Sequence, residues 1–521
     1  MKPKMFFLMN SIDLVRGGLT RASLKQASFF AEMGYETYML TFNFNPKYPL
    51  IRKKLLEMGK IHKDVIIKNM YEELEGIYNC PISFEDPPKT SLESLTEGLP
   101  FDKREGHNAY RVYDNGVYKK YINFHSNNFL DFIDYFNENR YRTKREIYNL
   151  KGQLKKVAYM DLALNKPRQL IYFNDKGQAY FSQWNNPQSG KVQRILLFKP
   201  DGSIAKTYVN NDVTHKVDWL KSVINGANHE SVVISDTRST DEVLLQFNHP
   251  QATKIWRLHS SHLKDNSQPG GEIASKVETG FNNIEKFDAC VFLSEEQRQD
   301  IIQRVGDKGN FKVIPHFHEN TSFKDTVKNL MKNNKKDQNL AVIISRLSGL
   351  KRIDHSIKAF SKVVKKKPDA RLEIWGTGDQ ENALNKLIKE LHLEKNVTLK
   401  GYTHNPDDIY KKGLFSILTS KSEGFALSVL ESMVNKTPVI SYHIKYGPAD
   451  MIVDNQNGFL VENDNIEQLA NKMIHMFENV DNAIEMGKKA NRYINDNFNK
   501  TTYKNKWLEV VEETTSKKSN K

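Results

Sequence analysis

The chain has 521 residues, of which 39% are apolar and 27% charged, and its formal net charge is +14. This length exceeds what one hydrophobic core organises, so we expect two or three domains, and the composition excludes a disordered chain. No apolar run approaches the roughly 18 residues of a membrane span, and Cys80 and Cys290 predict no disulfide framework, which favours a cytoplasmic protein.

A basic surface attracts polyanions, but charge alone does not distinguish nucleic acid from anionic lipid or another phosphate polymer. No RNP motif, zinc finger or helix-turn-helix pattern accompanies the charge. We therefore expect no nucleic acid among the partners. Peripheral contact with the inner face of the cytoplasmic membrane is compatible with the same charge.

The N-terminal 65 residues predict the opening of a doubly wound α/β domain. A strand over residues 4–9 enters the turn Gly17-Gly18, a helix follows over 19–33, and a second strand covers 37–42. We expect residues 1–65 and 210–318 to form a first Rossmann-like domain. Its later strands are expected at 231–235, 254–258, 289–293 and 311–314.

Residues 66–209 differ in character, because short runs rich in Tyr, Phe, Asn and Lys alternate with turn signals. Asn174-Asp-Lys-Gly177 separates two strand-like runs and Pro200-Asp-Gly202 separates two more, as in β-hairpins. We expect an inserted, mostly antiparallel β module in this part of the chain.

Residues 339–497 have the clearest alternation of strands and helices and predict a second Rossmann-like domain. A polar segment over 319–338 is expected to be the linker, and 498–521 a terminal helix and a tail that frays after Glu512. The strands of the second domain are expected at 340–344, 370–375, 397–399, 415–418, 438–440 and 458–461.

The most informative motif is Glu423-Gly-Phe-Ala-Leu-Ser-Val-Leu-Glu431, which follows a predicted buried strand and becomes helical near Leu427. Free N–H groups and the dipole at such a helix start favour a diphosphate. Gly424 would let the backbone approach a ligand, and Glu431 is placed to accept hydrogen bonds from sugar hydroxyls. Alone, such a pair of glutamates more often flanks an ordinary helix start.

Two further strand–helix junctions of the same domain carry groups that suit a phosphate. Arg346 and Lys351 follow its first predicted strand and would reach the crevice at the carboxyl ends of the strands. A guanidinium and an ammonium there suit a diphosphate leaving group. Trp375-Gly-Thr-Gly-Asp379 is a Gly-rich turn at the next junction. The three junctions together favour a phosphate-bearing ligand.

The order of these motifs resembles the GT-B retaining glycosyltransferases over both Rossmann-like halves. The resemblance implies an α/β fold with two Rossmann-like domains that face a cleft. Residues 66–209 are similar to the β-rich insertion of the wall-teichoic-acid branch, which implies a homo-oligomer, with a trimer favoured. The matching motifs are Gly17-Gly18, Ser345-Arg-x4-Lys351-Arg352, Trp375-Gly-x-Gly378, Lys400-Gly-Tyr402 and the motif from Glu423 to Glu431.

The resemblance also implies a role for each site residue. Arg346 and Lys351 would stabilise the departing diphosphate. Glu431 would hold the nucleotide ribose, and Glu423 would contact the donor hexose. The other donor-binding positions, which would approach phosphate, base or sugar, are Gly17, Gly18, Gly376, Tyr402, Thr403, Gly424, Phe425, Ala426 and Leu427.

His259 directly follows the predicted strand 254–258 and, by the resemblance, faces the transferred sugar. His262 is the second choice, and a structural histidine is the alternative reading. No carboxylate or cysteine has matching spacing nearby, so this His-x-x-His pair is not expected to bind a metal. GT-B enzymes generally need no metal, and we expect no cofactor.

The resemblance implies transfer of a hexose, with glucose favoured, from a UDP-sugar to poly(glycerol-phosphate) wall teichoic acid. One alternative is UDP-N-acetylglucosamine-dependent transfer to poly(ribitol-phosphate) or to a Ser-rich protein. Another is a non-catalytic protein that binds a polyanion or a sugar nucleotide. An anionic polyol-phosphate polymer suits the basic chain and predicts salt-sensitive binding.

Overall fold

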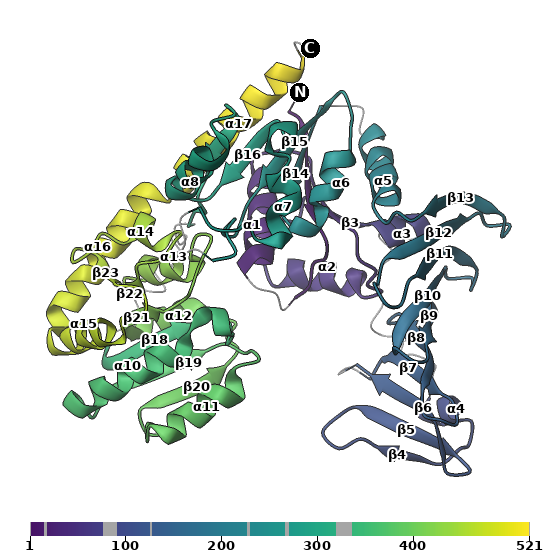
Figure 1. Cartoon of the computed structure of the whole chain (residues 1–521), viewed down its shortest axis with the longest axis horizontal. Helices are drawn as coiled ribbons and strands as arrows, with labels where there is room; N and C mark the ends of the chain where they lie inside the picture. The colour runs from purple at the N-terminus through teal and green to yellow at the C-terminus, as the bar shows by residue number, and fades with distance from the viewer. Residues whose placement is uncertain are drawn as a thin grey trace. The chain divides into compact units, whose positions relative to one another are not determined.

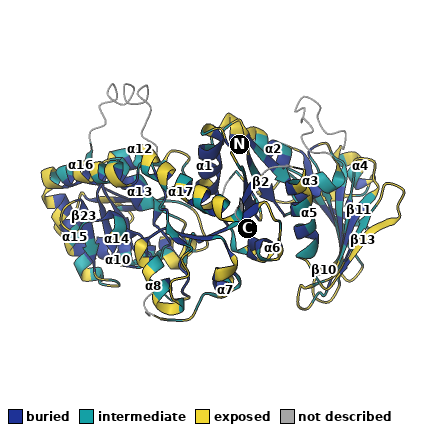
Figure 2. Ribbon diagram, turned by 90° about the horizontal axis from the view of Figure 1, so that it is seen from above, coloured by how far each residue is buried: buried dark blue, intermediate teal, exposed yellow. Residues whose placement is uncertain are grey.

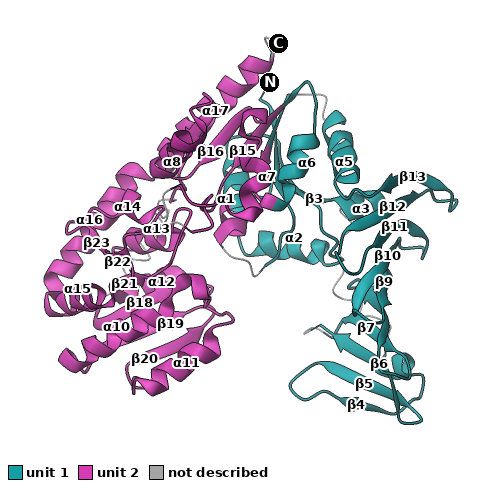
Figure 3. Cartoon of the chain, viewed as in Figure 1, with its two compact units in different colours: residues 1–16, 23–233, 239–252 teal, residues 17–22, 234–238, 253–521 magenta. Residues whose placement is uncertain are grey.

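The computed structural model describes residues 2–14, 18–76, 91–125, 128–226, 230–265, 270–318 and 336–519. The chain divides into two compact units, which Figure 3 distinguishes by colour. The first unit consists of residues 1–16, 23–233 and 239–252, and the second of residues 17–22, 234–238 and 253–521. In both units the residues of the parallel strands are mostly buried (Figure 2).

The first unit contains parallel strands in the order β14-β1-β2-β3. The expected first strand is confirmed as β1, and its apolar run is buried because parallel strands are covered on both faces. The helix expected over 19–33 is α1 (Gly18–Glu32), whose residues up to Ala22 belong to the second unit, and α2 (Tyr48–Glu57) precedes β3. The strand bounds are β1 Lys4–Met9, β2 Thr37–Thr41, β3 Val65–Asn69 and β14 Ser231–Ser235.

The same unit holds a ten-stranded antiparallel sheet in which each strand pairs with the next along the chain, from β4 to β13 (Figure 1). Both expected hairpins are confirmed: β10 pairs with β11 and β12 pairs with β13. The strand bounds are β4 Phe101–Lys103, β5 Ala109–Asp114, β6 Val117–Phe124, β7 Leu130–Phe136, β8 Arg142–Tyr148, β9 Leu154–Asp161, β10 Lys166–Phe173, β11 Ala179–Asn185, β12 Val192–Phe198 and β13 Ile204–Val209.

The antiparallel sheet begins later than the expected start of the insertion at residue 66. β3 pairs in parallel with β2, with Val65 opposite Thr37, and α3 (Met70–Glu75) follows it. The run Val65-Ile-Ile fits either kind of strand, so its partner strand decides the sheet to which it belongs. The end of the antiparallel sheet at Val209 agrees with the expectation.

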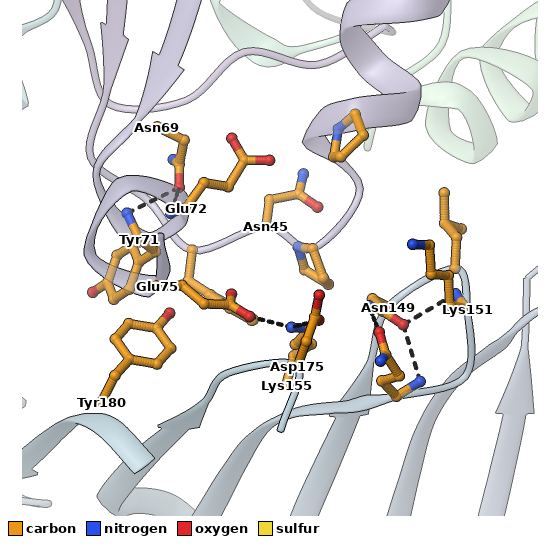
Figure 4. Close-up of a pocket in the computed structure, with 15 residues that line it drawn as sticks. Asn45, Asn69, Tyr71, Glu72, Glu75, Asn149, Lys151, Lys155, Asp175 and Tyr180 are labelled. Atoms are coloured by element: carbon orange, nitrogen blue, oxygen red, sulfur yellow. Dashed lines mark hydrogen bonds and ion pairs between the residues drawn. The ribbon is translucent and has the colours of Figure 1, made fainter. Parts of the chain in front are cut away.

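A cavity of about 50 Å³ lies in the first unit between α3 and the turns of the antiparallel sheet (Figure 4). Lys155 is only 2% exposed there and forms ion pairs with Glu75 and Asp175. Burial, together with the nearby Asp175 and Glu72, raises the pKa of Glu75 above its ordinary value, although Lys155 acts to lower it. This buried ion pair joins β9 to α3 across the cavity.

The second unit contains the parallel strands β15 (Ala252–Arg257), β16 (Ala289–Phe292) and β17 (Phe311–Val313). It also contains a six-stranded parallel sheet in the order β20-β19-β18-β21-β22-β23. All six expected strands of residues 339–497 are confirmed. They are β18 Asp337–Ile344, β19 Arg371–Trp375, β20 Val397–Gly401, β21 Gly413–Leu418, β22 Val439–Tyr442 and β23 Gly458–Val461.

The six-stranded sheet is covered on both faces, and alternate residues of β18 enter different cores. Ala341 and Ile343 join a core with the helices α10 (Ile353–Lys366), α11 (Glu381–Glu390) and α15 (Ile466–Glu478). Leu340 and Val342 pack with Tyr410 of α12 (Pro406–Lys412). The strand order reverses between β18 and β21, and ligands of such sheets bind outside the carboxyl ends of the strands at this switch point.

The chain ends in a helix, α17, that continues through Lys500–Ser519, whereas fraying was expected after Glu512. Thr514 is buried, and Glu513 forms an ion pair with Lys312. Tertiary contacts therefore order a segment whose composition is polar. Within the described ranges, no helix is both long enough and apolar enough to cross a membrane.

Candidate functional site

Lys351 and Glu423 form an ion pair at the switch point of the six-stranded sheet. Lys351 ends a short 3-10 turn, η3 (Gly349–Lys351), in the loop after β18, and Glu423 lies in the loop after β21. Ser420 Oγ donates to the same carboxylate oxygen of Glu423 at 2.6 Å. The two charged side chains are 18% and 14% exposed, so the pair is partly shielded from water.

Arg346 lies in the loop after β18 and is exposed. Its guanidinium forms no ion pair with any residue that the structure describes. A bidentate donor that is free at the carboxyl end of a strand can bind an anionic ligand.

The glycines of Trp375-Gly-Thr-Gly378 pack against the Arg346 loop. Gly376 has a φ of +139°, and a Cβ there would lie 1.8 Å from the carbonyl oxygen of Ser345. A Cβ on Gly378 would lie 2.1 Å from the carbonyl oxygen of Leu347. The donor-binding role expected for Gly376 stays a prediction, and its close contact in the structure is with the protein backbone. These glycines hold the loop that carries Arg346.

Gly424 packs in a similar way against the segment that carries His259. A Cβ on Gly424 would lie 2.1 Å from the carbonyl oxygen of His259 and 2.8 Å from Cα of Ser260. The approach of Gly424 to a ligand stays a prediction, and the close approach in the structure is to His259. It places the backbone of the Glu423 loop against the end of β15.

The helix α13 (Leu427–Val434) begins at the residue expected from the sequence. Ala426 precedes it in the left-handed conformation, with a φ of +64°, and no side chain caps the helix. The first N–H groups of an uncapped helix are free to donate to an anion, and the helix dipole favours negative charge there.

His259 is held by Asp236. Its Nε2 lies 2.6 Å from Oδ1 of Asp236, and its ring stacks on His316 with 5.4 Å between centroids. Burial, and then the nearby Arg257, lowers the pKa of His259 to about 4. A carboxylate only accepts, so we assign the proton of the neutral ring to Nε2. Nδ1 is then an acceptor, buried and without a hydrogen-bond partner in the described parts of the chain.

His262, the second choice from the sequence, has a different environment. It is 1% exposed and stacks between Phe281 and Tyr446, with centroids 5.8 Å and 6.0 Å away. Burial lowers its pKa to about 4. His262 is thus a packed aromatic residue, and the described residues contain no group of three or more His, Cys, Asp or Glu side chains placed to hold a metal ion.

Glu431, on the second turn of α13, lies 3.2 Å from the guanidinium of Arg21. A Cβ on Gly18 would lie 3.1 Å from Cδ1 of Leu427, so the start of α1 lies against the start of α13. Gly17 is outside the described residues.

Two further residues that were expected to bind the donor follow β20. Tyr402 is 44% exposed, and Thr403 Oγ1 accepts a hydrogen bond from the backbone N–H of Asn405.

Comparison with known proteins gives two family matches and, among the relatives, two that match over most of this chain. The model described as Glycosyl transferases group 1 matches residues 326–493, and Glycosyl transferase 1 domain A matches residues 6–198. The chain is 28% identical over 510 residues to the poly(ribitol-phosphate) alpha-N-acetylglucosaminyltransferase of Staphylococcus aureus (strain COL), covering 97% of this chain and 99% of that protein. It is 27% identical over 492 residues to the poly(glycerol-phosphate) alpha-glucosyltransferase of Bacillus subtilis (strain 168), covering 91% and 70%.

The fold matches a crystal structure of a mutant form of S. aureus TarM in complex with fondaparinux, alpha-GlcNAc-glycerol and UDP. The TM-score is 0.82 at 26% identity, over 98% of this chain and 100% of the other. The chain is a GT-B glycosyltransferase. Its two long relatives differ in sugar and in acceptor polymer, yet they are similar to this glycosyltransferase to almost the same degree.

In this glycosyltransferase, sequence reasoning missed three charged residues that hold the site. Asp236 orients His259, Arg257 is fully buried 3.9 Å from Asp236, and Arg21 pairs with Glu431. Asp236 directly follows the predicted strand 231–235, just as His259 follows the predicted strand 254–258. Its position at a strand end could therefore have marked it as a candidate. Arg257 lies inside a strand and Arg21 inside a helix, and no local signal marks either of them.

Proposed function

We propose that this glycosyltransferase moves a hexose from a UDP-sugar to a polyol-phosphate polymer, with retention of anomeric configuration and without a metal. The observation that carries the proposal is the convergence of Lys351, Glu423 and the His259 segment at one switch point. The names of both long relatives describe alpha-glycosyltransferases of polyol-phosphate polymers, and the TarM structure contains UDP, which supports this substrate class.

The leaving diphosphate would bind between the loop after β18 and the start of α13. Arg346 offers a guanidinium that forms no ion pair with the described residues, Lys351 offers further N–H donors beside Glu423, and the start of α13 offers backbone amides. Donors aimed at developing charge stabilise a transition state without reorganising. In a front-side transfer, the departing diphosphate would also take the proton of the acceptor hydroxyl on the same face of the sugar.

The sugar and the ribose would be held by groups already oriented by the protein. Glu423 accepts from Ser420 and Lys351, which fixes its carboxylate for contact with hexose hydroxyls. His259 is neutral at physiological pH, and its Nδ1 would accept a hydrogen bond from the hexose. Glu431, beside Arg21, would accept from the ribose hydroxyls.

Two pairs of sugar and polymer are candidates. The resemblance to the wall-teichoic-acid branch favours glucose and poly(glycerol-phosphate). One observation favours N-acetylglucosamine and poly(ribitol-phosphate): the S. aureus relative matches over 99% of its length, whereas the B. subtilis relative matches over 70%. We place the activity in the cytoplasm, with contact at the inner membrane face, because it needs a UDP-sugar and a polymer under assembly.

The test is to incubate the pure protein with UDP-glucose or UDP-N-acetylglucosamine and with each of the two purified polymers, with and without EDTA. Mass spectrometry identifies the sugar transferred, and proton NMR of the product reports its anomeric configuration. An α-linked product whose yield is unchanged by EDTA supports the proposal. Transfer to neither polymer, a β-linked product or a requirement for a divalent cation would overturn the corresponding part of it.

We also propose that the protein is a homotrimer assembled through the antiparallel sheet. Both strands at the edges of this sheet carry exposed apolar side chains. Ile204 and Val209 of β13 are 55% and 56% exposed, and Phe101 of β4 is 48% exposed. Exposed apolar residues on an unpaired edge strand suit pairing with another chain.

A further inference from the structure

One face of the helix α8 (Glu295–Val305) contacts the segment that carries His259 and the residues that hold the Glu423 loop. Gln297 is fully buried, and its Nε2 donates to the carbonyl oxygen of Ser260 at 2.9 Å. Asp300 lies three residues further along, on the same side of the helix. It accepts from the hydroxyl of Tyr446 at 2.6 Å and from Nζ of Lys445 at 2.8 Å.

Residues 445–447, which we call the bracket, hold the backbone of the Glu423 loop. The N–H of Glu423 donates to the carbonyl of Lys445 at 3.3 Å, and the N–H of Tyr446 donates to the carbonyl of Glu423 at 3.1 Å. Gly447 has a φ of +101°, and a Cβ there would lie 2.2 Å from the carbonyl oxygen of Phe425. The bracket therefore fixes the backbone from Glu423 to Phe425.

The contacts of Asp300 with the bracket are shielded from water. Tyr446 is fully buried, and its ring stacks on His262. The side chains of Asp300 and Lys445 are 20% and 25% exposed. Charge-assisted hydrogen bonds in such surroundings are stronger than those between neutral groups.

We propose that Asp300 is a positioning residue that sets Glu423 relative to His259. It acts through Tyr446 and Lys445 on the Glu423 loop, while Gln297 of the same helix holds the segment that carries His259. The inference rests on the proposed contacts of Glu423 and His259 with the donor hexose. The alignment of the hexose then depends also on α8, a helix that carries none of the motifs expected to bind the sugar nucleotide.

The test compares Asp300→Ala, Asp300→Asn and Tyr446→Phe with wild type. The matched control is Glu295→Gln, which removes a charge from the same helix where it pairs with Arg298. Each protein is assayed for kcat of transfer, for the Kd of UDP and of the UDP-sugar, and for Tm. Tyr446→Phe keeps the buried ring, so it tests the proposal even if Asp300→Ala fails to fold.

We expect Asp300→Ala to lower kcat about 10²-fold, because displacement of a positioning loop by about 1 Å has an effect of this size. The Kd of UDP should stay within about twofold, because Arg346 and Lys351 of the proposed diphosphate site lie in the loop after β18, outside the backbone that the bracket fixes. Asp300→Asn should recover part of kcat, since its amide oxygen still accepts from Tyr446. Glu295→Gln should behave as wild type.

Wild-type kcat in folded Asp300→Ala and Tyr446→Phe would overturn the inference. A Kd for UDP that weakens in step with kcat would also overturn it, because that result indicates a general structural loss. If the wild-type protein transfers no sugar, the proposed function is wrong. The positioning role of Asp300 can then still be tested from the ratio of the Kd for the UDP-sugar to the Kd for UDP. The inference predicts that Asp300→Ala loses the hexose part of the affinity alone, and an unchanged ratio would contradict it.

Discussion

The backbone of His259 and that of Gly424 meet so closely that only a glycine fits, since a Cβ at position 424 would lie 2.1 Å from the His259 carbonyl oxygen. Gly424→Ala must therefore displace one of the two segments, and we expect kcat of transfer to fall about 10²-fold. Kinetic assay of the folded variant checks this. Gly349→Ala is the matched control, because a Cβ there meets nothing within 4 Å. Equal activity of the two variants would contradict the prediction.

Lys351→Ala should lower kcat by about 10²-fold or more, because it removes a cation from the proposed diphosphate site. It also leaves the carboxylate of Glu423 with Ser420 as its remaining side-chain partner among the contacts described above. Steady-state kinetics with a fixed acceptor measures the effect. The control is Lys421→Ala, whose lysine pairs with Asp265 and is 52% exposed. A wild-type kcat for Lys351→Ala would remove Lys351 from the catalytic machinery.

Stability should fall in acid partly because of His262. Its folded pKa of about 4 lies below the ordinary value of 6.5, so the unfolded chain binds one more proton between these values. The contribution of His262 to the unfolding free energy is therefore fully present above pH 6.5 and falls by about 1.4 kcal/mol per pH unit as the pH drops toward 4. His262→Phe keeps the stacked ring and should reduce this slope in urea unfolding series at several pH values. An unchanged slope would contradict the assignment.

Lys155→Met should destabilise the first unit by about 3–5 kcal/mol, because it leaves the carboxylate of Glu75 buried without its cation. Urea unfolding followed by circular dichroism measures the loss. Lys206→Met is the control, since that lysine is 53% exposed in its pair with Asp218 and should change stability by less than about 1 kcal/mol. Adding Glu75→Gln to Lys155→Met should recover part of the loss, and a loss as large for Lys206→Met would contradict this explanation.

Replacement of Ile204 and Val209 by lysine should reduce the oligomeric mass. The two side chains lie on the edge strand β13, and charges there oppose pairing with another chain. Sedimentation velocity compares the variant with wild type. Leu56→Lys, at an exposed position on α2, is the control and should leave the mass unchanged. A wild-type mass for the β13 variant would place the assembly surface elsewhere.

Local patterns were sufficient to predict most elements and the residues at their ends. β1, β14 and β23 have the predicted bounds, and α13 begins at Leu427. Such predictions succeed because burial on both faces imposes an apolar run on each parallel strand, and helix starts follow from the adjoining turn. The boundary near residue 66 was not predictable in this way, because the partner of β3 is chosen by tertiary packing.

The sequence by itself determined the GT-B resemblance, the junctions that carry Arg346, Lys351 and Glu423, and the position of His259 at a strand end. Only the tertiary structure decided which of these residues meet. Lys351 and Glu423 are 72 residues apart, and they pair because β18 and β21 are neighbours in the sheet. The same holds for Gly376, Gly378 and Gly424, whose nearest atoms in the structure belong to the backbone of distant segments. Contacts between distant segments depend on the order of the strands, which no local pattern encodes.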